Sequence, residues 1–231
     1  MSARKPVITV DGPAGSGKST TARELARRLG YRHLDSGALY RALTFALLEE
    51  EVPEEEWPEL GPDDLEALEV RAEADAGGVR VFRRDRILRE ELRTEEVTEK
   101  VSHLSSIPSV RSWLLRRQRE AGRGGGVVAD GRDMGSVVFP DAELKVFLVA
   151  DLDERARRRL KERGEEESTS ALRAEGERLA ERDRRDRERA VAPLKPAGDA
   201  VPVDTTKLSI DEQVGRIIEL LEALTGSRGS A

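Results

Sequence analysis

The sequence contains no cysteine and no asparagine, and aromatic residues make up only 3% of its 231 positions. Without cysteine, neither a disulfide framework nor a thiolate metal site can form. No apolar run is long enough to span a membrane and no signal peptide is recognisable, so we expect a cytoplasmic protein without a membrane partner. The missing asparagine and the excess of arginine over lysine suggest a thermophilic source. A melting temperature in the mesophile range would contradict that hypothesis.

Charged residues make up 37% of the chain, and the net charge is −6. A negative net charge argues against a general nucleic-acid-binding protein. The acidic residues are unevenly placed, because residues 49–75 hold thirteen of them and one arginine. The rest of the chain is therefore net positive, as expected if an anionic ligand binds away from the acidic segment.

Five short apolar segments alternate with helical sequence, a pattern typical of a parallel sheet covered on both faces. The predicted strands are Val7–Asp11, Arg32–Asp35, Val127–Asp130, Leu144–Val149 and Ala200–Val203. The predicted helices cover residues 18–29, 37–51, 94–106, 109–121, 152–163, 171–190 and 209–225. The pattern predicts an α/β protein.

Some ninety residues separate the second and third predicted strands, too many for one crossover connection. Residues 49–69 contain three prolines and are predicted to form a linker and a short helix. Residues 70–74 and 79–82 flank Asp75-Ala76-Gly77-Gly78, which favours a β-hairpin. We therefore expect an inserted subdomain of mixed structure.

Residues 12–19 read Gly-Pro-Ala-Gly-Ser-Gly-Lys-Ser, between the first predicted strand and the first predicted helix. This is the P-loop pattern in its expected context. The glycines allow successive backbone N–H groups to point at phosphate oxygens. Lys18 would reach the β- and γ-phosphates, and the Ser19 hydroxyl would meet Mg²⁺. The alternative, a glycine-rich surface turn, does not explain both flanking elements, so the motif predicts binding of a nucleoside triphosphate.

A P-loop alone leaves the class of protein open. A GTPase needs a guanine-reading Asn-Lys-x-Asp segment, but the corresponding stretch is Thr206-Lys207-Leu208-Ser209 and the chain has no asparagine. A molecular motor normally needs a larger chain and a ring or partner, and nothing in the sequence suggests either. The class of small-molecule kinases remains.

Two clusters follow predicted strands. The first, residues 34–41, reads Leu-Asp-Ser-Gly-Ala-Leu-Tyr-Arg, in which Ser36 could serve a ligand or only cap the next helix. The second, residues 127–135, places Asp130 at the end of a buried strand, where a Mg²⁺-linked carboxylate is needed. Both clusters belong at the edge of the sheet where a P-loop lies.

A third cluster lies on a charged helix near residue 185. Arg182, Arg185, Asp186 and Arg189 have the spacing that places side chains on one helix face. Arginines on such a face can close over phosphates and stabilise a phosphoryl group in transfer. For most other charged residues of the segment 152–195, a solvated helix with ion pairs is the simpler interpretation.

Together these motifs resemble those of the bacterial cytidylate kinases across nearly the whole chain. The resemblance is carried by residues 11–19, 34–41, 129–135 and 181–194. It implies a P-loop NTP hydrolase-type three-layer fold with a five-stranded parallel sheet of order 2-3-1-4-5. It also implies one domain, with a core (1–36, 123–151 and 195–226), an NMP-binding insertion (37–122), a lid (152–194) and a frayed tail (227–231).

The resemblance implies transfer of the γ-phosphoryl group of Mg²⁺-ATP to CMP or dCMP by a monomer. The residues that would hold the acceptor phosphate and the moving group are Arg41, Arg132, Arg182 and Arg189. The catalytic residues would be Lys18, Arg132, Arg182 and Arg189. The residues that would bind ATP are Gly12, Pro13, Ala14, Gly15, Ser16, Gly17, Lys18, Ser19, Thr20, Arg155 and Arg157. The residues that would bind CMP are Ser36, Tyr40, Arg41, Ser102, Arg111, Arg132, Asp133, Arg182, Asp186 and Arg189. The metal-binding residues would be Ser19 and Asp130.

Several alternatives stay open. Thr20 competes with Ser19 for the metal, because glycine often follows the P-loop lysine in the family that the chain resembles. Ser102 and Arg111 lie on ordinary-looking predicted helices, so only the resemblance assigns them to cytosine recognition. A kinase for UMP or shikimate, or a nucleotide-binding switch without turnover, would also fit the P-loop.

Overall fold

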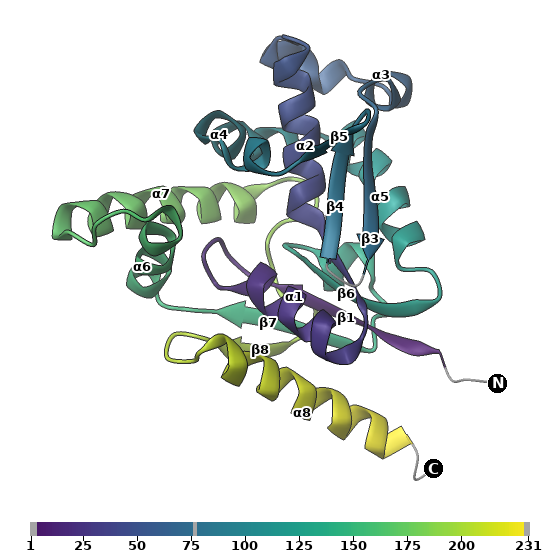
Figure 1. Ribbon diagram of the computed structural model, residues 1–231, viewed down its shortest axis with the longest axis vertical. Coiled ribbons are helices and arrows are strands. Elements are labelled where there is room, and N and C mark those ends of the chain that lie inside the picture. Colours follow the sequence, from purple (N-terminus) through teal and green to yellow (C-terminus); the bar gives the residue numbers. More distant parts are fainter. Residues whose placement is uncertain (1–3, 76–77, 229–231) are drawn as a thin grey trace.

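The computed structural model describes residues 4–75 and 78–228. Its central sheet has five parallel strands in the order β2-β6-β1-β7-β8 (Figure 1). The strands are β1 (Lys5–Asp11), β2 (Arg32–Asp35), β6 (Gly125–Gly131), β7 (Leu144–Val149) and β8 (Val201–Asp204). Numbered among themselves along the chain, they run 2-3-1-4-5, so the predicted strands and their order are confirmed. The register pairs Asp35 with Asp130 and Asp11 with Gly131, which brings three strand ends to one edge.

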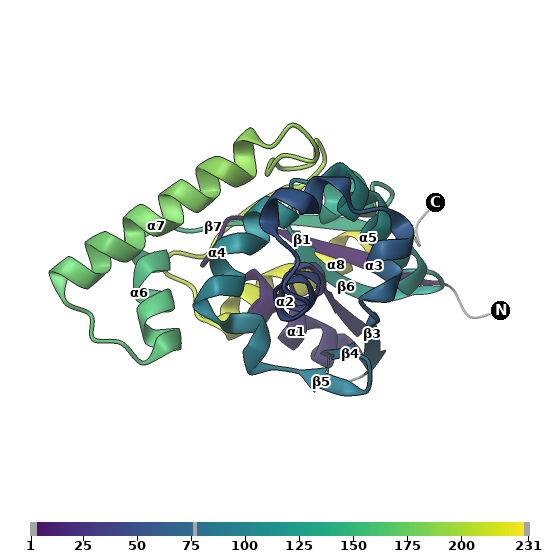
Figure 2. The same ribbon diagram turned by 90° about the horizontal axis from the view of Figure 1, so that it is seen from above.

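Helices cover both faces of this sheet. Helices α1 (Lys18–Leu29) and α8 (Ile210–Arg228) pack against one face, where Val128 is buried. Helices α2 (Ser36–Glu49) and α5 (Pro108–Ala121) belong to the apolar cluster on the other face, which contains Val127 and Ala129. Neighbouring residues of β6 enter different clusters because successive side chains of a strand point to opposite faces. The three predicted layers are visible in Figure 1 and Figure 2.

The predicted insertion forms a second, antiparallel sheet of β3 (Val70–Asp75), β4 (Gly78–Arg83) and β5 (Arg86–Leu88). The hairpin of β3 and β4 is confirmed, although Ala76 and Gly77 lie outside the described residues. β5 was not predicted, because three residues show no usable alternation. The remaining elements of this region are η1 (Glu54–Glu59), α3 (Pro62–Ala67), η2 (Glu90–Arg93) and α4 (Glu95–Leu104).

Helices α6 (Leu152–Arg163) and α7 (Thr169–Glu188) extend away from the core (Figure 2). The prediction ended α7 two residues too late, so Arg189 lies just past the helix. At the other end of the chain, α8 continues through Gly226 to Arg228, beyond the predicted end at 225. An interior glycine costs only about 1 kcal/mol relative to alanine, which is too little to end a helix. Ser227 and Arg228 therefore belong to α8 rather than to the predicted tail, and residues 229–231 lie outside the described residues.

One short element follows β6, a single π-helical turn η3 (Met134–Val138). The sequence pattern did not predict it. Across the described ranges, no helix combines the length and the apolar character needed to cross a membrane.

Candidate active site

The P-loop connects β1 to α1. Gly15 and Gly17 have φ angles of 75° and 89°, a conformation that favours glycine. At Gly15 a Cβ atom would also lie 3.1 Å from the Cβ atom of Arg155 on α6. The Nζ atom of Lys18 donates a hydrogen bond to the Pro13 carbonyl at 3.1 Å, so the lysine folds back over the loop. Burial, together with the charge of Arg132, lowers the pKa of Lys18 well below its usual value.

Ser19, the second residue of α1, connects the P-loop to β6. Its hydroxyl donates a hydrogen bond of 2.5 Å to Oδ2 of Asp130, whereas the Thr20 side chain is exposed. The predicted pair Ser19 and Asp130 is therefore assembled, and Thr20 points elsewhere. Burial acts to raise the pKa of Asp130, but the hydrogen bond and charge of His33, the Ser19 hydroxyl and Lys18 together lower it.

Asp11, the last residue of β1, holds the start of η3. Its two carboxylate oxygens accept hydrogen bonds from the backbone N–H groups of Met134 at 2.9 Å and Gly135 at 2.8 Å. Burial raises the pKa of Asp11 to about 7 despite those two bonds. The role of Asp11 was not predicted, although its place at the end of a buried strand is the same signal that pointed to Asp130.

Cationic side chains converge beside the P-loop, and we call Lys18, Arg41, Arg132, Arg182 and Arg189 the cation cluster. They come from α1, α2, the segment after β6, and α7 with the residue after it. Burial and the charges of Arg132 and Arg41 lower the pKa of Arg182 to about 9. Nε of Arg182 and Nη2 of Arg189 are buried without a hydrogen-bond partner among the described residues. The positive charges of the cluster repel one another, and some of its N–H donors have no acceptor. A bound anion would relieve both costs, so the cluster is suited to an anion.

One carboxylate, Asp186 on α7, balances part of this charge. Its Oδ2 atom accepts a hydrogen bond of 2.8 Å from Nε of Arg132. Burial opposes ionisation, but Arg132, Arg189 and Arg182 together lower the pKa of Asp186. Arg185, predicted to share this face, is about half exposed and lies near Glu181 at 3.6 Å. Only part of the predicted arginine face therefore points inward.

A second ion pair lies deeper, between Arg111 on α5 and Asp133 after β6. Arg111 also donates a hydrogen bond of 3.0 Å to the Ser105 carbonyl. Burial raises the pKa of Asp133, even though the Arg111 charge acts in the opposite direction. The aromatic ring of Tyr40 lies 5.8 Å from the Arg111 guanidinium. Burial raises the pKa of Tyr40 to about 12.

Ser36 does not cap α2, so that alternative is wrong. The carboxylate of Asp35 accepts the capping hydrogen bond from the Ala38 N–H at 2.9 Å. Ser36 is the first helical residue, and its hydroxyl accepts a hydrogen bond of 2.8 Å from Gln118. Its side chain is thereby free of a capping role and borders the same pocket as Arg111.

All of the predicted catalytic, acceptor-binding and metal-binding residues border one pocket, which we call the central pocket. They are Lys18, Ser19, Ser36, Tyr40, Arg41, Ser102, Arg111, Asp130, Arg132, Asp133, Arg182, Asp186 and Arg189. The free volume is about 70 Å³. Ligand pockets typically measure roughly 300 Å³ or more, so this free volume is smaller than a nucleotide needs.

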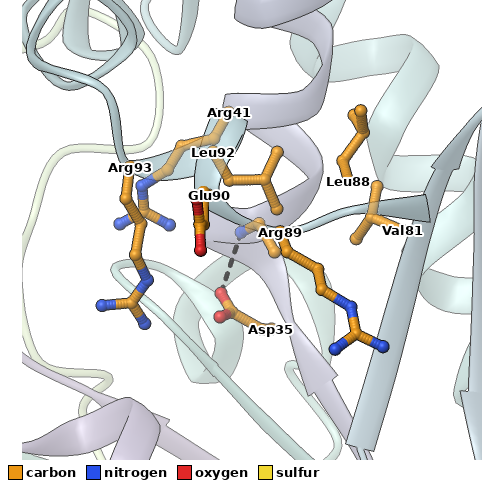
Figure 3. A pocket seen from close by; sticks show the side chains of 9 residues that line it. Asp35, Arg41, Val81, Leu88, Arg89, Glu90, Leu92 and Arg93 are labelled. Carbon is orange, nitrogen blue, oxygen red and sulfur yellow. Dashed lines mark hydrogen bonds between the residues drawn. The ribbon is translucent and has the colours of Figure 1, made fainter. Parts of the chain in front are cut away.

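A second cavity of about 360 Å³ adjoins the central pocket and shares Asp35 and Arg41 with it. Figure 3 shows its apolar wall of Val81, Leu88 and Leu92, which belong to the insertion. Arg41 and Arg93 extend toward the same side of this cavity (Figure 3). The cavity thus lies between the start of α2 and the later part of the insertion, at β4, β5 and η2.

The structure does not bring the predicted ATP-binding residues Arg155 and Arg157 into the central pocket. Arg155 is buried and donates hydrogen bonds to Asp183 at 2.5 Å and to the Ala14 carbonyl at 3.0 Å. Arg157 is exposed and pairs with Glu154 at 3.0 Å. Arg158, which was not predicted, is the residue that reaches from α6 to the loop after β8, where it donates to Thr205.

A P-loop at the edge of a parallel sheet, a serine–carboxylate pair and a cluster of inward-facing cations define the class of P-loop phosphotransferases. Within that class, the chain belongs to the cytidylate kinase family, whose profile, described as "Cytidylate kinase", matches residues 8–223.

Curated relatives support the same assignment. The chain is 47% identical over 219 residues to a cytidylate kinase of Exiguobacterium sibiricum, and the alignment covers 95% of this chain and 98% of that protein. It is 47% identical over 226 residues to a cytidylate kinase of Vibrio cholerae, and that alignment covers 96% of this chain and 99% of that protein. A solved structure of an uncharacterized protein from Eubacterium ventriosum superposes with a TM-score of 0.51 at 14% identity, covering 95% of this chain and 99% of that one. That structural likeness concerns the fold alone.

Proposed function

We propose that this chain transfers the γ-phosphoryl group of ATP to CMP and dCMP, giving ADP and the nucleoside diphosphate. The observation that carries the proposal is the central pocket itself. It is lined by the P-loop residue Lys18, by the buried pair of Arg111 and Asp133, and by the rest of the cation cluster. Two anionic substrates could therefore meet end to end, with their phosphates at the cluster.

The P-loop would hold the ATP phosphates, and the residues beside it fit Mg²⁺. Ser19 and Asp130 offer hard oxygen donors 2.5 Å apart. Magnesium is commonly held by one or two carboxylates together with substrate phosphates, so this small donor set suits it. A Mg²⁺ ion held by these two residues would supply positive charge that neutralises the negative charge developing on the phosphates.

The cation cluster would stabilise the phosphoryl group in transfer. Phosphoryl transfer depends mainly on positioning and on stabilising charge that spreads over the equatorial oxygens. The unpaired N–H groups of Arg182 and Arg189 are already buried and available before the substrate arrives, which lowers the cost of reorganisation. Arg41 and Arg132 would bind the acceptor phosphate.

Asp133, Arg111 and Ser102 would read the base. Cytosine presents an N4 amino donor, which a carboxylate can accept, while its O2 and N3 atoms accept from arginine and serine. Uracil has a carbonyl at C4, which would face the Asp133 carboxylate with no proton between them. Leaving that acceptor unpaired should disfavour UMP by roughly 1–3 kcal/mol. Ser36 and Tyr40 would line the same acceptor site.

The acceptor would reach this site by separating the ion pair of Arg132 and Asp186. The phosphate would then replace Asp186 on Arg132, and Asp186 would turn to the sugar hydroxyls.

We also propose that the chain divides into a core (1–36, 123–151 and 195–226), an NMP-binding insertion (37–122) and a lid (152–194). The insertion and the lid would close over both nucleotides and exclude water. Because one chain supplies the whole central pocket, we propose a monomer as the active unit.

The test is ADP formation from Mg²⁺-ATP with CMP, dCMP, UMP, AMP and shikimate offered separately. The proposal predicts strong turnover with CMP and dCMP and little with the others. Preference for UMP or shikimate would mean that the chain is a kinase but that the base-reading residues are wrongly assigned. ATP binding without turnover of any acceptor would instead support a nucleotide-binding switch.

A further inference from the structure

A buried chain of hydrogen bonds runs from the P-loop to a histidine on the neighbouring strand. The Ser19 hydroxyl donates to Oδ2 of Asp130 at 2.5 Å, and Nε2 of His33 lies 2.6 Å from Oδ1 of the same carboxylate. His33 is 5% exposed and Asp130 is 1% exposed. Each carboxylate oxygen therefore has its own partner, from α1 on one side and from β2 on the other.

The sheet explains how His33 reaches Asp130. His33 lies opposite Val128 in the parallel register of β2 and β6, and Asp130 is two residues further along β6. Residues two apart on a strand share a face, so both side chains lie on the α1 side of the sheet. An ionised carboxylate only accepts hydrogen bonds, so the proton of this contact is on Nε2 of His33.

We propose that His33 is a positioning residue for the transfer reaction. Its Nε2–H group fixes the orientation of Asp130, so that the other carboxylate oxygen faces Ser19 and the metal ion that accompanies ATP. This inference rests on the proposed function only in its use of Mg²⁺-ATP, and not on which acceptor is phosphorylated. His33 itself does not border the central pocket.

Removing the histidine would leave a buried carboxylate oxygen without a partner. Asp130 could then turn away from Ser19, and the pair would lose its preorganised geometry. Partners that orient a metal ligand are typically worth about 10–100-fold in metal affinity. The loss should therefore appear in the contribution of Mg²⁺ to ATP binding, and much less in binding of the metal-free nucleotide.

The experiment compares ATP dissociation constants, measured by calorimetry, in excess Mg²⁺ and in EDTA. Three variants are used with the wild-type protein: His33→Asn, whose amide is too short to reach Asp130, His33→Gln, whose amide can reach it, and His103→Gln. His103 is a matched control because it is 41% exposed and pairs with Glu54 on the insertion. Urea unfolding of each variant verifies that it is folded.

We expect His33→Asn to reduce the Mg²⁺-dependent gain in ATP affinity by about 10–100-fold, with the EDTA value nearly unchanged. His33→Gln should retain most of the gain, and His103→Gln all of it. An unchanged gain in His33→Asn would overturn the proposal. So would an equal loss with and without Mg²⁺, which would indicate a purely structural role. The binding experiment contains ATP but no acceptor nucleotide. Its result can therefore be interpreted even if the chain fails to phosphorylate CMP.

Discussion

Arg155 on α6 and Asp183 on α7 form a buried pair that is attached to the P-loop at both ends. Nη1 of Arg155 lies 2.5 Å from Oδ2 of Asp183 and 3.0 Å from the Ala14 carbonyl. The other carboxylate oxygen of Asp183 accepts a hydrogen bond of 3.2 Å from the Ala14 N–H. The two helices of the proposed lid are thus connected to the loop that would hold ATP.

This arrangement predicts that Arg155 matters for stability. Arg155→Met leaves Asp183 buried and uncompensated, so the free energy of unfolding should fall by about 3–5 kcal/mol. Arg157→Met is the matched control, because its side chain is about half exposed. The control should stay within about 0.5 kcal/mol of the wild-type protein. Urea unfolding measures both values, and an equal effect of the two variants would refute the structural role of Arg155.

Arg155 and Arg157 were both predicted to bind ATP, because both occur on one arginine-rich helix. Which of the two side chains turns inward depends on where α7 packs. The partner of Arg155, Asp183, lies 28 residues away in the sequence. Local periodicity carries no information about such a contact. The same limit explains why Arg158, which reaches the loop after β8, was missed.

The P-loop lysine should be indispensable for transfer. Lys18→Ala removes the charge that would approach the β- and γ-phosphates, and loss of one such group typically lowers kcat by about 100–1,000-fold or more. A coupled assay of ADP formation with CMP measures the effect. Lys161→Ala, on the exposed side of α6, is the control and should keep wild-type turnover. If Lys18→Ala retained a tenth of wild-type kcat, the proposed role would be wrong.

Short apolar runs that alternate with helical sequence were enough to predict five parallel strands, since buried parallel strands are nearly continuous apolar runs. The strand order was implied by the resemblance to the cytidylate kinases, because apolar runs carry no information about which strands are neighbours. The motifs also predicted where the central pocket lies, because the P-loop, Asp35 and Asp130 stand at strand ends that meet at one edge. The acceptor-binding residues of the pocket were assigned by the resemblance. What the sequence could not show was pairing across the fold, such as His33 with Asp130. Nor could it show that Arg189 lies beyond the end of α7.

Asp11 should make stability depend on pH in an unusual direction. Burial raises its pKa in the folded protein to about 7, whereas the unfolded value is about 4. Between these values the folded state binds more protons than the unfolded state. Raising the pH should therefore lower the free energy of unfolding, by at most about 1.4 kcal/mol per pH unit. The contribution is fully present below pH 4 and is lost as the pH rises through 7.

The comparison is urea unfolding of the wild-type protein and of Asp11→Asn between pH 5 and 8. The variant lacks the titrating group, so its stability should fall less steeply with pH. Asp63→Asn, at an exposed position, should behave like the wild-type protein. Equal slopes for wild type and Asp11→Asn would contradict the prediction, and a carbon-13 titration of the Asp11 carboxyl group would give the pKa directly.

The assignment of the base-reading residues is tested by the ratio of kcat/KM for CMP to that for UMP, in the wild-type protein and in Asp133→Ala. We expect a wild-type ratio of about 5–150, from the cost of an unpaired buried acceptor. In Asp133→Ala the ratio should approach one, mainly through a higher KM for CMP, with Asp141→Ala as the exposed control. A ratio that Asp133→Ala leaves unchanged would contradict the assignment of the base-reading site.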